Sequence, residues 1–304
     1  MDPTRRLPQS LAVHARAFAE RTREPVEPRD ASTVVLVRDG DGRPGGLEVY
    51  LLRRSTTMAF AGGFCVFPGG GVDPRDFDHE IGWAGPSPSA WARELATSEE
   101  HARALVCAAV RETFEESGVL LAGPTAESVV GDTTGPGWED DRRRLEARAL
   151  SFTDFLDRRG LVVRSDLLAF WGSWVTPVVE PRRYDTRFFL AALPCGQVTR
   201  DVSSESDRVA WLPVRAVLDA VADGRLAMLP PTLATCLELH EFRTPPEALA
   251  AGGSRNRDPI LPEVQLDEQG AYLRLPPHLV ALADRVATER RVGEASGQVG
   301  GDAS

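Results

Sequence analysis

The sequence predicts an α/β domain in which helices cover a mixed β-sheet. Two apolar runs flank the Asp-Gly residues at 39–42, a long helical pattern covers 99–117, and strand patterns return at 168–179 and 184–192. Asp-Gly residues between apolar runs are typical of an antiparallel hairpin. A chain that combines hairpins with one long amphipathic helix favours a layered α/β fold.

The first half of the chain supplies two expected strands and a glycine-rich segment. Residues 32–38 read STVVLVR and residues 47–53 read LEVYLLR, and both have the apolar, β-branched composition of buried strands. A glycine-rich turn is expected between Gly62 and Gly71. Residues 72–97 are rich in Pro, Gly, Trp and charge, which indicates a long loop with one short helix at about 90–96.

The helix over 99–117 has the clearest signals at both ends. Thr97 and Glu100 can form a capping box. Gly118 is expected as the residue that ends the helix. Apolar side chains recur at helical spacing between these ends, at Ala102, Leu105, Val106, Ala109, Val110 and Phe114.

The second half of the chain continues the domain and adds an extension. The expected elements are a helix at 138–149, the two strands named above, a strand at 208–212, helices at 213–222 and 231–241, a hairpin around Asp267–Gly270 and a helix at 277–290. We therefore expect an N-terminal extension over 1–29, a domain over 30–223 with inserts at about 72–97 and 122–160, a C-terminal extension over 224–291 that packs on the domain, and a disordered tail over 292–304.

Composition excludes several classes of partner. The 304 residues carry 45 acidic against 35 basic side chains, a net charge of −10, so the mean field repels nucleic acid and anionic membranes. We expect no membrane span, no signal peptide and a cytoplasmic protein. The four cysteines form no CxxC pair, which argues against a zinc site. Every basic residue is arginine, so a phosphate-bearing ligand would need arginines or a metal.

Three glutamates near the end of the long helix are the sharpest chemical signal. At 100° per residue, Glu115 and Glu116 lie about 60° and 40° to either side of Glu112, so the three carboxylates share one face. Anions at a helix C-terminus are unfavourable unless a positive group offsets them. Mg²⁺ or Mn²⁺, which bind carboxylate oxygens, would do so. The alternative is a solvated acidic face on which Arg111 pairs with Glu115.

The run from Arg111 to Val119, RETFEESGV, resembles the second half of the Nudix hydrolase signature, Arg-Glu-U-x-Glu-Glu-x-Gly-U, where U is a bulky apolar residue. The first half departs from it, because 41 positions separate Gly70 from Arg111 where a contiguous signature has 14, an insertion of about 27 residues. Arg103 stands eight residues before Arg111, where the signature has glutamate. Asp76, six residues after Gly70, is the candidate for the displaced acid.

The segment before the signature resembles a pattern of the coenzyme A diphosphatase branch of that family. Leu51-Leu52-Arg53-Arg54-Ser55 leads to Phe67-Pro68-Gly69-Gly70 with the spacing of that branch. Ala61 stands where the branch has histidine, and Met58 where it has leucine.

The resemblance implies a Nudix-type α/β/α sandwich with helical inserts and a helical and hairpin extension. It implies a Mg²⁺- or Mn²⁺-dependent diphosphatase that acts on a nucleotide-type small molecule, coenzyme A or acyl-coenzyme A. Open alternatives are ADP-ribose or a dinucleotide as substrate, and a catalytically silent nucleotide sensor. A homodimer is also left open.

The resemblance also assigns roles to individual residues. Glu112, Glu115 and Glu116 would hold the metal, and Arg111 would fix Glu112. Arg53, Arg54, Gly69 and Gly70 would contact the substrate, and Glu205 would serve as a base. The alternative for Arg53 and Arg54 is that each forms an ion pair at the end of its strand. The alternative for Glu205 is an ordinary exposed acid in a loop. The insert at 72–97 is expected to line the mouth of the site, with Trp83 or Trp91 within reach of a ligand.

Overall fold

A mixed β-sheet forms the centre of the molecule. The computed structural model describes residues 4–6, 13, 15–18, 20, 24–40, 46–55, 62–204, 206–268 and 270–299. The strands of the central sheet are β2 (Arg29–Asp39), β3 (Leu47–Arg54), β4 (Cys65–Val66), β5 (Gly69–Gly71), β9 (Ala169–Val175), β10 (Tyr184–Ala192) and β11 (Ser206–Pro213). The strand predicted at 184–192 is confirmed to the residue.

The order of strands in this sheet is β11-β3-β2-β10-β9, with β4 beside β3 and β5 beside β2. Strands β2 and β10 run parallel, and the other neighbours run antiparallel, so the predicted mixed sheet is confirmed. The expected hairpin is confirmed by the pairing of Val37 with Val49, although residues 41–45 of its turn lie outside the described residues.

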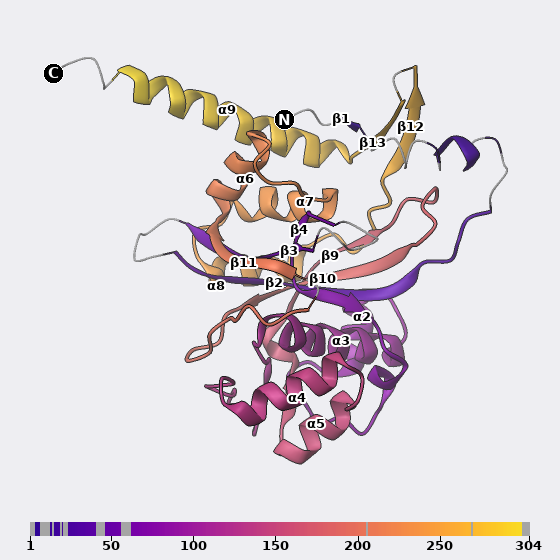
Figure 1. Cartoon of the computed structure of the whole chain (residues 1–304), viewed down its shortest axis with the longest axis vertical. Coiled ribbons are helices and arrows are strands. Elements are labelled where there is room, and N and C mark those ends of the chain that lie inside the picture. Colours follow the sequence, from indigo (N-terminus) through magenta and orange to yellow (C-terminus); the bar gives the residue numbers. More distant parts are fainter. Residues whose placement is uncertain are drawn as a thin grey trace.

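Alternate residues of β2 face two different hydrophobic cores. Val34 and Leu36 belong to the core shared with α3, whereas Val35 and Val37 belong to the core shared with the C-terminal helices. This two-residue alternation is the geometry of a strand buried on both faces. The chain is therefore an α/β/α sandwich, as predicted (Figure 1).

One layer consists of the helices between β5 and β9, drawn below the sheet in Figure 1. They are α2 (Pro88–Leu95), α3 (Glu99–Ser117), α4 (Pro136–Glu146) and α5 (Phe152–Arg159), with the short 3-10 helices η1 (Pro74–Phe77) and η2 (Ser165–Leu167) and a small sheet of β6 (Trp83–Ala84), β7 (Ala122–Gly123) and β8 (Val162–Arg164). The hydroxyl of Ser32 on β2 donates to the backbone oxygen of Leu105 at 2.6 Å, which fastens α3 to the sheet.

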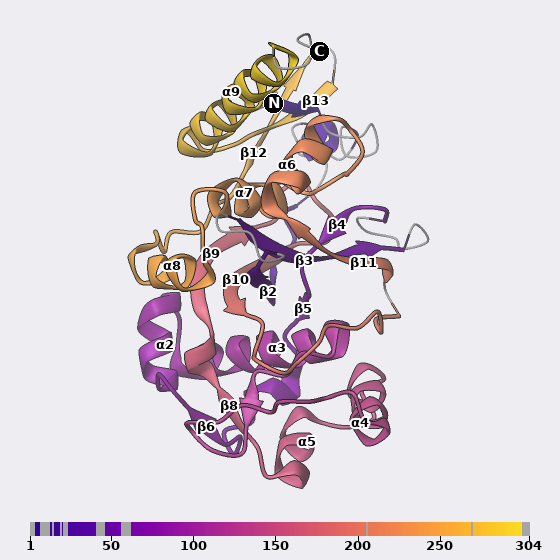
Figure 2. The same cartoon turned by 90° about the vertical axis from the view of Figure 1, so that its left-hand side faces the viewer.

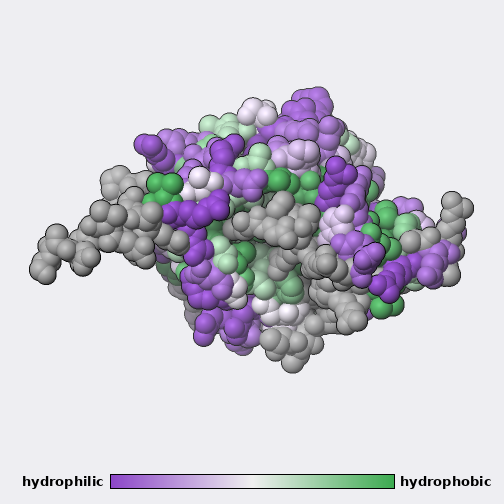
Figure 3. All heavy atoms as spheres, turned by 90° about the horizontal axis from the view of Figure 1, so that it is seen from above, coloured by the Kyte–Doolittle hydropathy of each residue, from purple (hydrophilic) through white to green (hydrophobic). Residues whose placement is uncertain are grey.

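The other layer comes from the last third of the chain and lies on the opposite face of the sheet (Figure 2). It contains α6 (Val214–Ala222), α7 (Pro230–Leu239), α8 (Pro245–Ala251), η3 (Gly252–Ser254), the hairpin β12 (Glu263–Asp267) and β13 (Gly270–Arg274), and α9 (Pro277–Val299). Strand β1 (Thr4–Arg6) pairs with β13, so an N-terminal segment joins the C-terminal hairpin. Seen from above, hydrophilic and hydrophobic residues of this layer are interspersed (Figure 3).

Helix α3 begins and ends through local hydrogen bonds. Its N-cap is Ser98, whose side chain accepts from the backbone N–H of His101, so the capping box predicted for Thr97 and Glu100 is wrong. Ser98 is the N-cap because its hydroxyl lies next to the first turn, where free N–H groups need an acceptor. Gly118 ends the helix with φ of 76°, a left-handed conformation that glycine adopts without strain, as predicted.

Three expectations for the outer segments need correction. Residues 72–97 and 122–160 hold more structure than predicted, since η1, β6, β7 and α5 lie within them, and α8 was missed in the extension. Helix α9 continues to Val299, so residues 292–299 of the tail predicted to be disordered are helical, and residues 300–304 of that tail lie outside the described residues. The domain boundary at 223 stays a prediction. No helix among the described residues is long and apolar enough to cross a membrane.

Candidate active site

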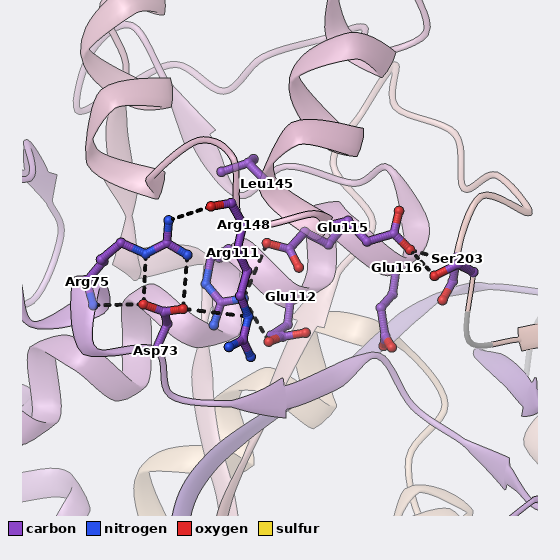
Figure 4. A pocket seen from close by; sticks show the side chains of 11 residues that line it. Asp73, Arg75, Arg111, Glu112, Glu115, Glu116, Leu145, Arg148 and Ser203 are labelled. Atoms are coloured by element: carbon purple, nitrogen blue, oxygen red, sulfur yellow. Dashed lines mark hydrogen bonds and ion pairs between the residues drawn. The ribbon is translucent and has the colours of Figure 1, made fainter. Parts of the chain in front are cut away.

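The last two turns of α3 form the floor of a polar pocket. Glu112, Glu115 and Glu116 all line it, as the shared helical face predicts (Figure 4). Arg111 of the same helix also lines it, and the rest of the lining comes from the two inserts and from the loop before β11: Asp73, Arg75, Leu145, Glu146, Arg148, Ser203 and Ser204. The structure thus brings the three predicted metal residues into one concave site.

Arg111 is the buried hub of the floor. Its guanidinium donates to both carboxylate oxygens of Asp76 at 3.0 and 2.9 Å, and to the backbone oxygen of Gly71 at 3.0 Å. It also donates to Glu112 at 2.7 Å and to Glu115 at 3.3 Å. Burial alone would lower the pKa of Arg111, but the hydrogen bonds that it donates to Asp76 and the charges of the surrounding carboxylates raise it above its ordinary value. Arg111 therefore stays charged and holds the glutamates in place.

Asp76 comes from the insert and is almost completely buried, with a relative exposure of 1%. It sits in η1, whose N-cap Asp73 exchanges hydrogen bonds with it in a reciprocal capping box. The run Asp73-Pro74 is a good start for such a turn, because proline suits the first helical position. The displaced acid suggested by the sequence is thus in bidentate contact with Arg111.

The glycine-rich segment packs directly against the glutamates. The backbone N–H of Gly69 donates to Glu116 at 2.8 Å. A Cβ at Gly70 would lie 2.6 Å from the carboxylate atoms of Glu112, so only glycine leaves that carboxylate its place. The predicted turn is instead the short strand β5, which pairs Gly69 with Thr33 and Gly70 with Ser32. These glycines shape the floor of the pocket.

Carboxylates outnumber guanidinium groups in the lining. Asp73, Glu112, Glu115, Glu116 and Glu146 face Arg75, Arg111 and Arg148 across the pocket. Desolvation by burial raises the pKa of Glu115 to about 7, Arg111 opposes this shift, and the charge of Glu112 adds to it. An acidic, oxygen-rich lining of this kind suits a hard divalent cation.

The donor chemistry fits such a cation, but the oxygens already have partners. Arg111 holds Glu112 and Glu115, and the Gly69 N–H holds Glu116. Accordingly, within the part of the chain that the structure describes, no three His, Cys, Asp or Glu side chains stand grouped as a ready metal site. A cation on this face would have to compete with Arg111.

The second insert supplies part of the pocket wall through Leu145, Glu146 and Arg148. Buried Arg142 on α4 donates to the backbone oxygen of Glu115 at 2.6 Å and to Glu146 at 3.0 Å, which ties α4 to the end of α3. Glu146 in turn accepts from the N–H and hydroxyl of Ser204 at 3.0 and 2.6 Å. The loop before β11 is therefore held at the pocket by the insert.

Some of the predicted residues lie elsewhere. Of the described residues, Arg53 and Arg54 at the end of β3 are outside the pocket lining. Arg53 pairs with Asp207 at 2.6 Å, which is the strand-end ion pair considered as its alternative. The substrate role of Arg54 stays a prediction. Glu205 lies outside the described residues, between Ser204, which lines the pocket, and β11.

The insert at 72–97 lines the pocket through Asp73 and Arg75, whereas its tryptophans do not. Trp91 is buried in the core and packs edge-on against Phe189. Trp83 donates to the backbone oxygen of Pro86 at 2.7 Å. The prediction for Trp91 was wrong because its position on α2 turns a large apolar side chain toward the sheet.

The sequence reasoning did not identify Asp73, Arg75, Glu146, Arg148, Ser203 or Ser204 as pocket residues. The Asp-Pro start of η1 was a usable signal for the first two, since it marks an ordered turn within the insert. The other four residues reach the pocket only because α4 packs against α3, and no local sequence pattern predicts that packing.

Comparison with known proteins places this geometry in context. A family model described as the NUDT19 Nudix domain matches residues 87–239, about half of the chain. The acyl-coenzyme A diphosphatase NUDT19 of Gallus gallus is 30% identical over 209 residues, which cover 54% of this chain and 55% of that protein. The putative nudix hydrolase 7 of Caenorhabditis elegans is 27% identical over 220 residues, 71% of this chain and 61% of that protein.

The chain thus spans little more than half the length of these relatives. Among solved structures, the Nudix hydrolase from Alicyclobacillus acidocaldarius matches with a TM-score of 0.62 and 29% identity, over 74% of this chain and 96% of that one.

Proposed function

The chain belongs to the family of the NUDT19 Nudix domain, and from that premise we propose that it is a metal-dependent diphosphohydrolase. Its substrate would be a nucleoside diphosphate derivative, coenzyme A or an acyl-coenzyme A. The observation that carries the proposal is the floor of the pocket: three glutamates on one face of α3, held by a buried Arg111 that is itself held by Asp76.

The glutamates Glu112, Glu115 and Glu116 would hold Mg²⁺ or Mn²⁺. When bound, such an ion neutralises phosphate charge and lowers the pKa of coordinated water. Nudix hydrolases generally use divalent metals. In an acidic pocket of an acidic protein, such a counter-charge would strengthen the binding of a polyanionic substrate.

The other residues of the floor position the three glutamates. Arg111 orients Glu112 and Glu115 from below, and Asp76 keeps Arg111 in position. Gly70 leaves room for the Glu112 carboxylate, and the Gly69 N–H fixes Glu116. These contacts hold the carboxylates in place before a ligand arrives, which lowers the cost of organising the site.

Two observations favour coenzyme A. The spacing from Leu51 to Gly70 resembles the coenzyme A branch, and the relatives from Gallus gallus and Homo sapiens are named acyl-coenzyme A diphosphatases. Hydrolysis would add water across the P–O–P bond and release a phosphopantetheine and adenosine 3′,5′-bisphosphate. Glu205 is the proposed base, and its neighbour Ser204 lines the pocket. Its role, a cytoplasmic location and a homodimer stay predictions.

A substrate panel tests this function. The purified chain is incubated with coenzyme A, acetyl-coenzyme A, ADP-ribose or a dinucleotide in Mg²⁺ or Mn²⁺, and products are separated chromatographically, with EDTA as control. We expect cleavage of the coenzyme A compounds that stops with EDTA. If coenzyme A is turned over at least about 100-fold less efficiently than ADP-ribose, the assignment of coenzyme A as substrate is wrong, whereas the proposed diphosphatase activity is retained. Binding without cleavage of any compound would indicate a sensor.

A further inference from the structure

Arg148 has an unusual backbone conformation at the edge of the pocket. Its φ is 56°, in the left-handed region that few non-glycine residues occupy. It follows Ala147, the C-cap of α4, and so occupies the position where helices commonly end with glycine. An arginine there costs stability relative to glycine.

The conformation is held by the end of the helix. The N–H of Arg148 donates to the backbone oxygen of Leu145 at 2.8 Å, and the next two N–H groups, of Ala149 and Leu150, donate to Arg144 at 2.8 and 3.1 Å. From the first insert, Arg75 donates to the backbone oxygen of Arg148 at 3.1 Å. The segment is therefore fixed from both sides.

The side chain of Arg148 reaches from the end of α4 into the pocket, toward Asp73 (Figure 4). It remains 79% exposed, and its ion pair with Asp73, at 3.9 Å, is at the limit of contact. By contrast, Asp73 already accepts two hydrogen bonds from the guanidinium of Arg75, at 2.9 and 3.0 Å, and one from its backbone N–H at 2.9 Å. Arg148 can therefore exchange its weak pair for a ligand at little cost.

We propose that Arg148 is a phosphate-binding residue of this pocket, presented by the second insert and positioned by Arg75. This inference rests on the proposed function and adds a ligand contact opposite the glutamate floor. Guanidinium groups bind phosphate oxygens in paired, charge-assisted hydrogen bonds. The phosphate is either the diphosphate or the 3′-phosphate of coenzyme A, and the experiment separates the two.

The experiment measures binding, so that it does not depend on turnover. Dissociation constants for coenzyme A and dephospho-coenzyme A are determined by calorimetry in EDTA, for the wild type, R148G and R148K. R148G removes the side chain and also relieves the strained backbone. Two variants serve as matched controls: R143A removes an exposed arginine of the same helix, and A96G relaxes the left-handed residue at the end of α2.

We expect R148G to weaken coenzyme A binding about 10-fold or more, with an unchanged or higher Tm, because a charge-assisted contact is lost while the fold is relaxed. R148K should lose part of the affinity, and both controls should bind as the wild type does. A loss of affinity for coenzyme A but not for dephospho-coenzyme A would assign Arg148 to the 3′-phosphate. An equal loss of affinity for both ligands would assign it to the diphosphate.

Binding by R148G within about twofold of the wild type would overturn the proposal, as would a Tm lowered together with affinity, which indicates a structural role. Wild-type protein that binds neither ligand in EDTA would also overturn it. The failure of the proposed function is a separate result. In that case the wild type and R148G would differ in binding, yet neither would cleave coenzyme A in Mg²⁺.

Discussion

Two arginines contact the same pocket from regions built in different ways. Arg111, on the floor, is 10% exposed and donates to three carboxylates and a backbone oxygen. Arg148, on the rim, is 79% exposed and reaches one carboxylate at 3.9 Å. The floor arginine organises the protein's own charges, whereas the rim arginine keeps its hydrogen-bonding capacity for a ligand.

The difference follows from where the two regions lie in the chain. The glutamates of the floor and Arg111 stand within six consecutive residues of one helix, so helical geometry alone brings them together. The rim joins η1, α4 and the loop before β11, which lie far apart in sequence. We therefore expect floor variants to affect folding and chemistry, and rim variants to affect binding.

The largest effect is expected from breaking the Asp76–Arg111 pair. D76N should lower the free energy of unfolding by about 3–5 kcal/mol, because it leaves a buried guanidinium without its main counter-charge. Chemical denaturation measures the change. D207N is the matched control, since it breaks the exposed pair with Arg53 and should leave the Tm unchanged. Equal stability of D76N and wild type would show that Arg111 is organised by its glutamates alone.

A second floor variant separates chemistry from folding. E116Q removes one charge without changing shape, so we expect kcat to fall by about 100-fold or more while the Tm is retained. Steady-state kinetics in Mg²⁺ provide the measurement. E100Q, in the exposed first turn of the same helix, should behave as wild type. Near wild-type turnover in E116Q would remove the glutamate from the metal assignment.

Glycines 70 and 71 test how closely the floor is fitted. In G70A the new methyl group would displace the Glu112 carboxylate, a flexible group, so we expect kcat/KM to fall about 10- to 100-fold with a small loss of stability. At Gly71 the nearest atom to a Cβ is 3.9 Å away, so G71A should be almost silent. The same kinetic loss in both variants would mean that flexibility of β5 matters rather than space.

The smallest effects are expected at the end of β3. Arg53 is occupied by Asp207, so R53A should change kcat/KM by less than about twofold. Arg54 fills the arginine of the coenzyme A pattern, and R54A should raise KM by about 10-fold. A larger kinetic effect of R53A than of R54A, measured by the same assay, would place the substrate contact at Arg53.

Much of this architecture could be predicted from the sequence. The strand at 184–192 and the helix at 99–117 are marked by strong periodicity, and the three glutamates followed from helical geometry. The convergence of Asp73 and Arg148 could not be predicted, because it depends on the packing of two inserts. The short helices α5 and α8 were missed, since helices of 8 and 7 residues, about two turns each, carry little periodic signal.

The most direct test of the floor as a metal site is the binding of Mn²⁺, followed by electron paramagnetic resonance of the free ion. Wild-type protein should take up Mn²⁺, and E116Q should bind it at least about 10-fold more weakly, since one charged ligand is lost. E100Q should match the wild type. Uptake of Mn²⁺ that is equal in wild type and E116Q, or absent from both, would contradict the account of α3 as the metal-binding floor of the pocket.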